Sequence, residues 1–146
     1  MGFFNSLDVN ATGLSAQQLR MDVISQNIAN VDTTKTENGT PYKRKIALFQ
    51  ERTQSPFSKY FNDAMSKSVA GNGVRVSRIV EDESEGTKVY EPGHPEADEE
   101  GYITKPNVNI VTEMVNMISA SRSYEANITA MNLTKGMIAK TLEISK

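Results

Sequence analysis

The sequence predicts a mainly α protein with a small β part and one long helix at each end of the chain. Apolar residues recur at helical spacing near the N-terminus and again from residue 108 onward. Between these stretches, short β-prone runs alternate with glycine, asparagine and acidic segments that are typical of turns. We therefore expect three parts: a helical segment over residues 1–34, a β and loop region over 35–107, and a helical segment over 108–146.

Length and composition exclude several classes of protein. The 146 residues suit a single folding unit, and a net charge of −2 gives no clustered basic surface for nucleic acid. The absence of cysteine excludes disulfides and thiolate metal sites. Residues 1–10 lack the basic and apolar segments of a signal peptide, and no stretch reaches the roughly 18 apolar residues of a membrane span. We expect neither a cleaved signal nor direct membrane insertion.

A first amphipathic helix is predicted over residues 7–31. Its apolar stripe is marked by four residues at intervals of seven, Leu7, Leu14, Met21 and Ile28. Asn5 or Ser6 is the expected N-cap, because both side chains can accept hydrogen bonds from the free amide groups of a first turn. The helix should end near residues 30–32, where asparagine, aspartate and threonine begin.

Asn27 and Asn30 stand three residues apart near the predicted end of this helix. Amide side chains at that spacing share one helix face, where they can hydrogen-bond a partner. They can also hydrogen-bond the nearby backbone and so help to end the helix. The second interpretation is slightly favoured, and both residues remain candidates for an assembly interface.

A second, longer helix is predicted over residues 108–144, after Pro106 and an N-cap at Asn107 or Asn109. Its apolar stripe alternates steps of four and three, which is the spacing of core positions in a coiled coil. The stripe consists of Ile110, Met114, Met117, Ser121, Tyr124, Ile128, Met131, Lys135, Ile138 and Leu142. Its two polar members, Ser121 and Lys135, are expected to help fix the register. A second apolar face consists of Val111, Val115, Ala126, Ala130, Leu133 and Met137.

The middle of the chain predicts a small β unit. Three strands are expected, over residues 43–50, 74–80 and 87–90. The turns between them are expected at Gly71-Asn72-Gly73 and in the acidic run 81–86. Residues 54–70 show no clear period and are expected to form a loop or a short helix.

The predicted helices are too long for a compact domain. A helix over residues 108–144 would span about 55 Å, whereas a compact domain of this size is roughly 40 Å across. The first helix, about 38 Å long, cannot cover both apolar faces of the second. Something outside the chain should cover the rest, as in a subunit packed among others. The candidate interface residues are Leu7, Leu14, Met21, Asn27, Ile28, Asn30, Met114, Met117, Tyr124, Ile128, Met131, Ile138 and Leu142.

No motif predicts catalysis. His94 is the only histidine and stands in a turn-like segment without a partner that resembles a nucleophile or a second metal ligand. The acidic segments 81–85 and 98–100 lack the spacing of a calcium loop. Dinucleotide, phosphate-loop and zinc-protease patterns are absent from the sequence. We expect no enzyme activity, no cofactor and no bound metal.

Several segments carry a family resemblance. Residues 25–34, Ser-Gln-Asn-Ile-Ala-Asn-Val-Asp-Thr-Thr, resemble the N-terminal signature of the flagellar rod and hook protein family. Within that family, four further segments resemble proximal rod subunits: residues 88–95, 101–103, 106–109 and 114–127. Residues 5–20 fit as well, and the resemblance covers nearly the whole chain except residues 51–72.

The resemblance implies a structural subunit of the proximal rod that serves flagellum-driven motility. In such a subunit the terminal helices pair antiparallel, like a coiled coil, in an inner domain, and the middle forms a small outer β unit. It further implies type III export without a cleaved signal and assembly in the periplasm. The implied partners are copies of itself and the rod proteins FlgB, FlgF, FlgG and FliE.

Two hypotheses on mechanism follow. Isolated helices are marginal in water, so the helices of a travelling subunit would be completed by the apolar stripes of its neighbours, and folding and assembly would be one event. The residues expected to carry this burial are Leu14, Met21, Ile28, Tyr124, Ile128, Met131 and Ile138. The alternative is a soluble adaptor or export chaperone that captures a partner helix in its apolar groove.

Overall fold

A computed structural model of the chain describes residues 3–52 and 72–144. Two long helices flank four strands, which confirms the predicted mainly α fold with a small β part. The elements in chain order are α1 (Phe3–Ala29), β1 (Lys45–Glu51), β2 (Val74–Glu81), β3 (Thr87–Tyr90), β4 (Tyr102–Lys105) and α3 (Ile110–Ile144). The loop or short helix expected over residues 54–70 lies outside the described residues.

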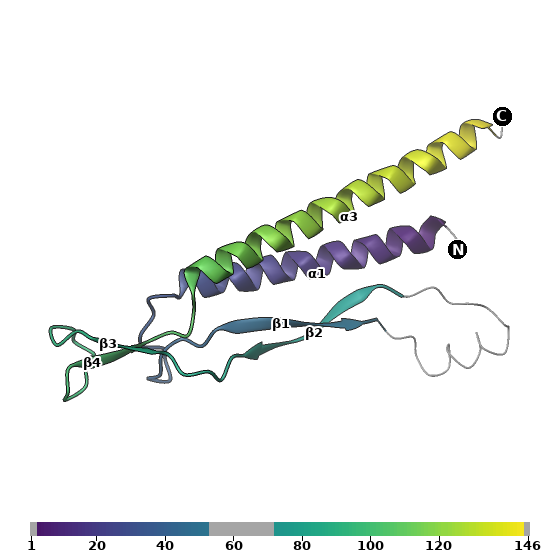
Figure 1. The fold of residues 1–146 in the computed structure, drawn as a ribbon. Helices are drawn as coiled ribbons and strands as arrows, with labels where there is room; N and C mark the ends of the chain where they lie inside the picture. Colours follow the sequence, from purple (N-terminus) through teal and green to yellow (C-terminus); the bar gives the residue numbers. More distant parts are fainter. Residues whose placement is uncertain (1–2, 53–71, 145–146) are drawn as a thin grey trace, which may run out of the picture.

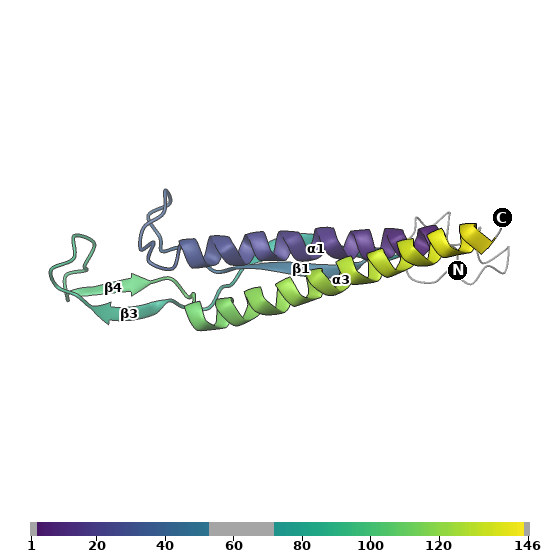
Figure 2. The same cartoon turned by 90° about the horizontal axis from the view of Figure 1, so that it is seen from above.

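The two helices form an antiparallel pair, and both chain ends lie at the same end of the molecule (Figure 1). Asn27 near the end of α1 contacts Glu113 near the start of α3, and Gly13 farther back in α1 lies against Asn127 farther along α3. The two helices cross at an angle, since the ends that overlap in Figure 1 lie apart in the view from above, and the ends that lie apart in Figure 1 overlap there (Figure 2). The antiparallel pairing implied by the resemblance is therefore present within one chain.

Helix ends follow local capping chemistry in part. The α3 N-cap is Asn109, whose side-chain oxygen accepts a hydrogen bond from the Thr112 amide at 3.1 Å. The predicted end of the first helix near residue 30 is confirmed, since α1 ends at Ala29. The N-cap predicted at Asn5 or Ser6 was wrong, because α1 begins at Phe3 and both residues lie inside it. Neither residue type disfavours a helix strongly enough to stop it there.

The central region contains two separate antiparallel hairpins (Figure 1). β1 pairs with β2, with a bulge between Leu48 and Phe49, and β3 pairs with β4 from Thr87 opposite Lys105 to Tyr90 opposite Tyr102. The three predicted strands are confirmed with small shifts at their ends. β4 was not predicted, because four residues between an acidic turn and Pro106 give too short a pattern to recognise.

α1 lies between two layers. In Figure 1, α3 covers one side of α1 and the β1–β2 hairpin lies along the other, while the β3–β4 hairpin extends past the end of the helix pair. Figure 2 shows the same projection of β3 and β4 from above. The buried apolar residues of the described part are few, namely Ala16, Val23, Ile24, Ile103 and Ala120. Nothing in the described chain covers the side of α3 that faces away from α1.

The β1–β2 hairpin approaches α1 closely at one glycine. Gly73 has φ +89°, in the left-handed region that favours glycine, and a Cβ added there would collide with the Thr12 hydroxyl. That hydroxyl accepts a hydrogen bond from the Val74 amide at 3.2 Å. Gly73 therefore lets β2 begin directly against α1.

Candidate assembly surfaces

A buried polar cluster joins the two helices to the start of β1. Asn27 of α1 is fully buried and Glu113 of α3 is 1% exposed. The Asn27 Nδ2 donates to Glu113 Oε2 at 2.9 Å and to the Lys45 carbonyl at 2.8 Å. Its Oδ1 accepts from the Lys45 amide at 2.8 Å and from the Tyr42 hydroxyl at 3.0 Å. Both donors and both acceptor positions of the Asn27 amide are therefore used within the chain.

Arg44 neutralises the Glu113 carboxylate. Its Nε and Nη2 donate to Glu113 Oε1 at 3.0 and 2.7 Å, and Asn116 Nδ2 donates to the same oxygen at 3.3 Å. Burial raises the pKa of Glu113, but hydrogen bonds from Asn27 and Arg44 and the positive charge of Arg44 outweigh it and hold that pKa below its ordinary value. Glu113 is therefore ionised at neutral pH, and the cluster is a satisfied ion pair rather than a proton-transfer site.

Asn107 extends this polar cluster to the second half of the β region. Its Oδ1 accepts from the Arg44 amide at 2.7 Å, and its Nδ2 donates to the carbonyls of Asp82 and Ser84, each at 3.0 Å. The stretches before β1, after β2 and before α3 thus meet at one side chain. Of the two predicted N-cap candidates for the second helix, Asn107 serves this junction and Asn109 is the cap.

Asn30 ends α1, as the favoured interpretation predicted. Its Nδ2 donates to the Gln26 carbonyl at 2.9 Å, and its Oδ1 accepts from the Thr33 hydroxyl at 3.2 Å. Asn27 fits neither of the two interpretations, because it bonds across to α3 and β1 within the same chain. No sequence pattern predicts the pairing of Asn27 with Glu113, since the two residues stand 86 positions apart.

The face of α3 that meets α1 is small and polar. It includes Glu113, Ala120, Asn127 and Thr134, which recur at intervals of seven. Three of these four are buried, and Asn127 lies so close to α1 that a Cβ added at Gly13 would approach its Nδ2 to 3.1 Å. The predicted heptad stripe is not this seam.

The structure places the predicted stripe of α3 in two settings. Its half-buried members flank the seam and are Met117, Ser121, Tyr124, Met131 and Ile138. Its exposed members are Ile110, Met114, Ile128, Lys135 and Leu142. The Asn27–Glu113 bond and the close approach at Gly13 place a face of polar and small residues of α3 against α1. On α1, the predicted quartet Leu7, Leu14, Met21 and Ile28 is half-buried throughout.

The opposite side of α3 is an uncovered apolar surface, called here the outer face. At about 100° per residue, most of its members fall on the half of α3 that points away from the seam, whereas Ile110 and Met137 stand three residues from Glu113 and Thr134 and flank it. A first group consists of Ile110, Val111, Met114, Val115 and Ile118, and a second of Ile128, Leu133, Met137, Leu142 and Ile144. Val111 is 71% exposed and Leu133 is 65% exposed. An exposed apolar stripe of this length marks a protein contact surface.

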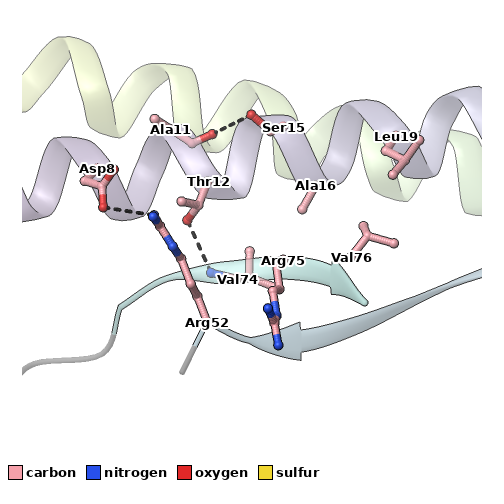
Figure 3. Close-up of a pocket in the computed structure, with 10 residues that line it drawn as sticks. All are labelled: Asp8, Ala11, Thr12, Ser15, Ala16, Leu19, Arg52, Val74, Arg75 and Val76. Carbon is pink, nitrogen blue, oxygen red and sulfur yellow. Dashed lines mark hydrogen bonds and ion pairs between the residues drawn. The ribbon is translucent and has the colours of Figure 1, made fainter. Parts of the chain in front are cut away.

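A shallow groove of about 460 Å³ runs between α1 and the β1–β2 hairpin (Figure 3). Its polar contacts are an exposed ion pair between Arg52 and Asp8 at 3.3 Å and the bond from the Val74 amide to Thr12. The Asp8 pair is solvent-exposed and stabilises the fold little. Paired catalytic groups are not among the residues that line this groove.

Within the described residues, the predicted turn histidine makes only local contacts. The His94 Nδ1 accepts a hydrogen bond from the Glu96 amide at 3.2 Å. The same part of the chain contains no group of histidine, cysteine, aspartate and glutamate side chains arranged to hold a metal ion. Neither described helix has the combined length and apolar content needed to cross a bilayer. Within the described residues, the candidate contact surfaces are therefore the outer face of α3 and the two hairpins.

Comparison with known proteins identifies relatives along the whole chain. Residues 7–35 match the family described as "Flagella basal body rod protein", and residues 99–144 match "Flagellar basal body rod FlgEFG protein C-terminal". The flagellar basal-body rod protein FlgC of Bacillus subtilis is 53% identical, with both chains covered completely. The protein of that name from Borreliella burgdorferi is 47% identical over 99% of this chain and 98% of its own. The one from Salmonella typhimurium is 40% identical over both full lengths.

Proposed function

This chain belongs to the FlgC family of flagellar basal-body rod proteins and is a structural subunit of the rod, and we propose that it assembles through the outer face of α3. The family is structural, so the chain is not an enzyme, and the adaptor or chaperone alternative is not favoured. The observation that carries the proposal is a pair of exposed apolar groups, one in each half of α3, on a helix that contacts only α1 among the described helices and strands.

The outer face has the size and two-part form of a surface shared among neighbours. α3 has 35 residues and is therefore about 52 Å long, which is enough for contact with more than one subunit. Its two apolar groups are separated by the mostly polar residues 119–125. We assign each group to a helix of a neighbouring subunit, in line with helix packing in which apolar side chains of one helix fill the spaces of the next.

The neighbours belong to the rod, where this chain assembles with other basal-body rod components. The specific partners we propose are further copies of this chain and the rod proteins FlgB, FlgF, FlgG and FliE. We also propose that the helical segments, residues 1–34 and 108–146, form the inner assembly domain, and that residues 35–107 form the outer part. Assembly in the periplasm after type III export, without a cleaved signal, completes the proposal.

The small apolar core of the single chain would link its export to its assembly, because the helices would be incomplete before neighbours bind. The described part has only five buried apolar residues in its core, so the single chain has little apolar burial to offset the entropy of ordering two long helices. Helix formation would then be completed when neighbours cover the outer face. The rod subunit would travel with incomplete helices and fold as it joins the rod.

A single charge on the outer face tests this assignment. Leu133→Asp is expected to weaken self-association in sedimentation by about tenfold or more, because assembly would bury an unpaired carboxylate. The matched control is Ser119→Asp, at an exposed position in the polar stretch between the two apolar groups, which should change association little. Association of Leu133→Asp equal to that of the parent protein would exclude the outer face as the contact.

A further inference from the structure

The β3–β4 hairpin presents an uncovered aromatic pair. Tyr90 and Tyr102 stand directly opposite each other, with ring centroids 5.2 Å apart and an interplanar angle of 62°. They are 62% and 41% exposed, whereas Ile103 on the other face of the hairpin is buried. Of the described helices and strands, β3 and β4 contact only each other. Aromatic side chains in this setting are typical of an interface core.

Acidic residues are concentrated in the sequence around this hairpin. Residues 81–100 contain nine acidic residues and one basic residue, Lys88. Because the net charge of the whole chain is only −2, the remainder of the chain has a net positive charge. Glu99 and Glu100, in the turn before β4, are exposed. Their carboxylates form no ion pair with a described residue. The aromatic pair with Glu99 and Glu100 is called here the acidic tip.

A complementary surface lies on the β1–β2 hairpin. Arg75 and Arg78 of β2 are exposed, and neither forms an ion pair within the described part of the chain. They are opposite Gln50 and Leu48, which are two residues apart on β1. The bulge therefore brings both arginines to one face of the hairpin, although they are three residues apart in sequence. Figure 3 shows the Arg75 side chain extending away from α1.

We propose that the acidic tip of one subunit docks on Arg75 and Arg78 of a second copy of this chain. Guanidinium groups stack on tyrosine rings and pair with carboxylates, so the two surfaces complement each other in both charge and chemistry. The proposal rests on assembly of this chain into a rod and adds a contact between β regions to the helix contact.

The two surfaces cannot meet within one chain. The hairpins lie end to end in Figure 1, with β3 and β4 beyond the end of the helix pair. β2 runs toward the acidic tip, and Arg75 lies about 20 Å along the strand before its last residue, Glu81. A contact between two different surfaces of identical chains can repeat from copy to copy, which suits an open helical assembly.

Charge reversal with mixing tests the docking. One variant carries Arg75→Glu and Arg78→Glu, and the other carries Glu99→Arg and Glu100→Arg. Each alone places like charges at the contact and is expected to weaken self-association, measured by sedimentation, by about tenfold or more. An equimolar mixture should regain most of the association, because each tip then meets an opposite charge on the other variant. Raising the salt concentration should weaken the parent contact through screening.

The control and the contrary outcomes separate this inference from the helix assignment. Lys35→Glu with Arg122→Glu changes the net charge as much as the arginine variant does, at exposed sites elsewhere, and should leave association close to that of the parent. Three outcomes would each overturn the docking. The charge variants could associate like the parent, their mixture could fail to regain association, or the parent could stay monomeric. If only Leu133→Asp fails to associate, the helix contact stands and the docking does not.

Discussion

Glu113 shows how one residue fixes the arrangement of the fold. A carboxylate with 1% exposure would cost several kcal/mol if left alone, yet here Asn27, Arg44 and Asn116 satisfy it. The sequence allowed prediction of the local role of Asn30, whose partners lie within four residues. It did not allow prediction of the contacts that Asn27 and Arg44 make with Glu113. Their partners come from distant parts of the chain, so the contacts leave no periodic pattern in the sequence.

Glu113→Gln removes the buried negative charge from this cluster and leaves Arg44 with only its longer ion pair to Asp82, at 3.7 Å. We expect a loss of about 1–3 kcal/mol in the free energy of unfolding, measured in urea at one fixed protein concentration. The pKa of Glu113 is lowered on folding, so its contribution is complete above the unfolded value of about 4.3 and is lost as the pH falls through the folded value. The acid-side loss of stability should therefore be smaller in the variant.

The control for this prediction is Glu125→Gln, which alters an exposed carboxylate on the same helix and should change stability by less than about 0.5 kcal/mol. Equal stability of Glu113→Gln and the parent, together with unchanged acid behaviour, would show that the buried ion pair does not hold the helices together.

At the scale of elements, long periodic segments were predictable and their rotation was not. Heptad spacing predicted both helices to within a few residues, because 3.6-residue periodicity extends over many turns. The same spacing did not identify the seam with α1, because α3 has more than one apolar face and the pattern alone cannot tell which face meets α1. Glu113 and the close approach at Gly13 decide the rotation, and both depend on tertiary contacts.

Two glycines in the helices test the close approach. Gly136 has no atom within 4 Å of a would-be Cβ, so Gly136→Ala should stabilise the protein by about 1 kcal/mol through helix propensity. Gly13→Ala should gain clearly less, because its Cβ would lie 3.1 Å from Asn127 Nδ2. Thermal unfolding at a fixed protein concentration compares the two variants. Equal gains in stability would show that the seam at Gly13 accommodates a Cβ atom without steric cost.

At the scale of the whole molecule, the mismatch between long helices and a small core explains the function. The β1–β2 hairpin covers one side of α1, α1 covers one side of α3, and the outer face of α3 stays open. The need for an outside partner was predictable from helix length alone. The acidic tip and the complementary surface at Arg75 and Arg78 were not predictable. They depend on β4 and on the bulge in the β1–β2 ladder, which only the three-dimensional structure shows.

The central claim is that helix formation and assembly are completed together. The most direct test is sedimentation of the purified protein over a concentration series, with circular dichroism recorded on the same samples. We predict that helicity rises as large species appear, since neighbours complete the helices. A compact and fully helical monomer at every concentration would contradict the claim.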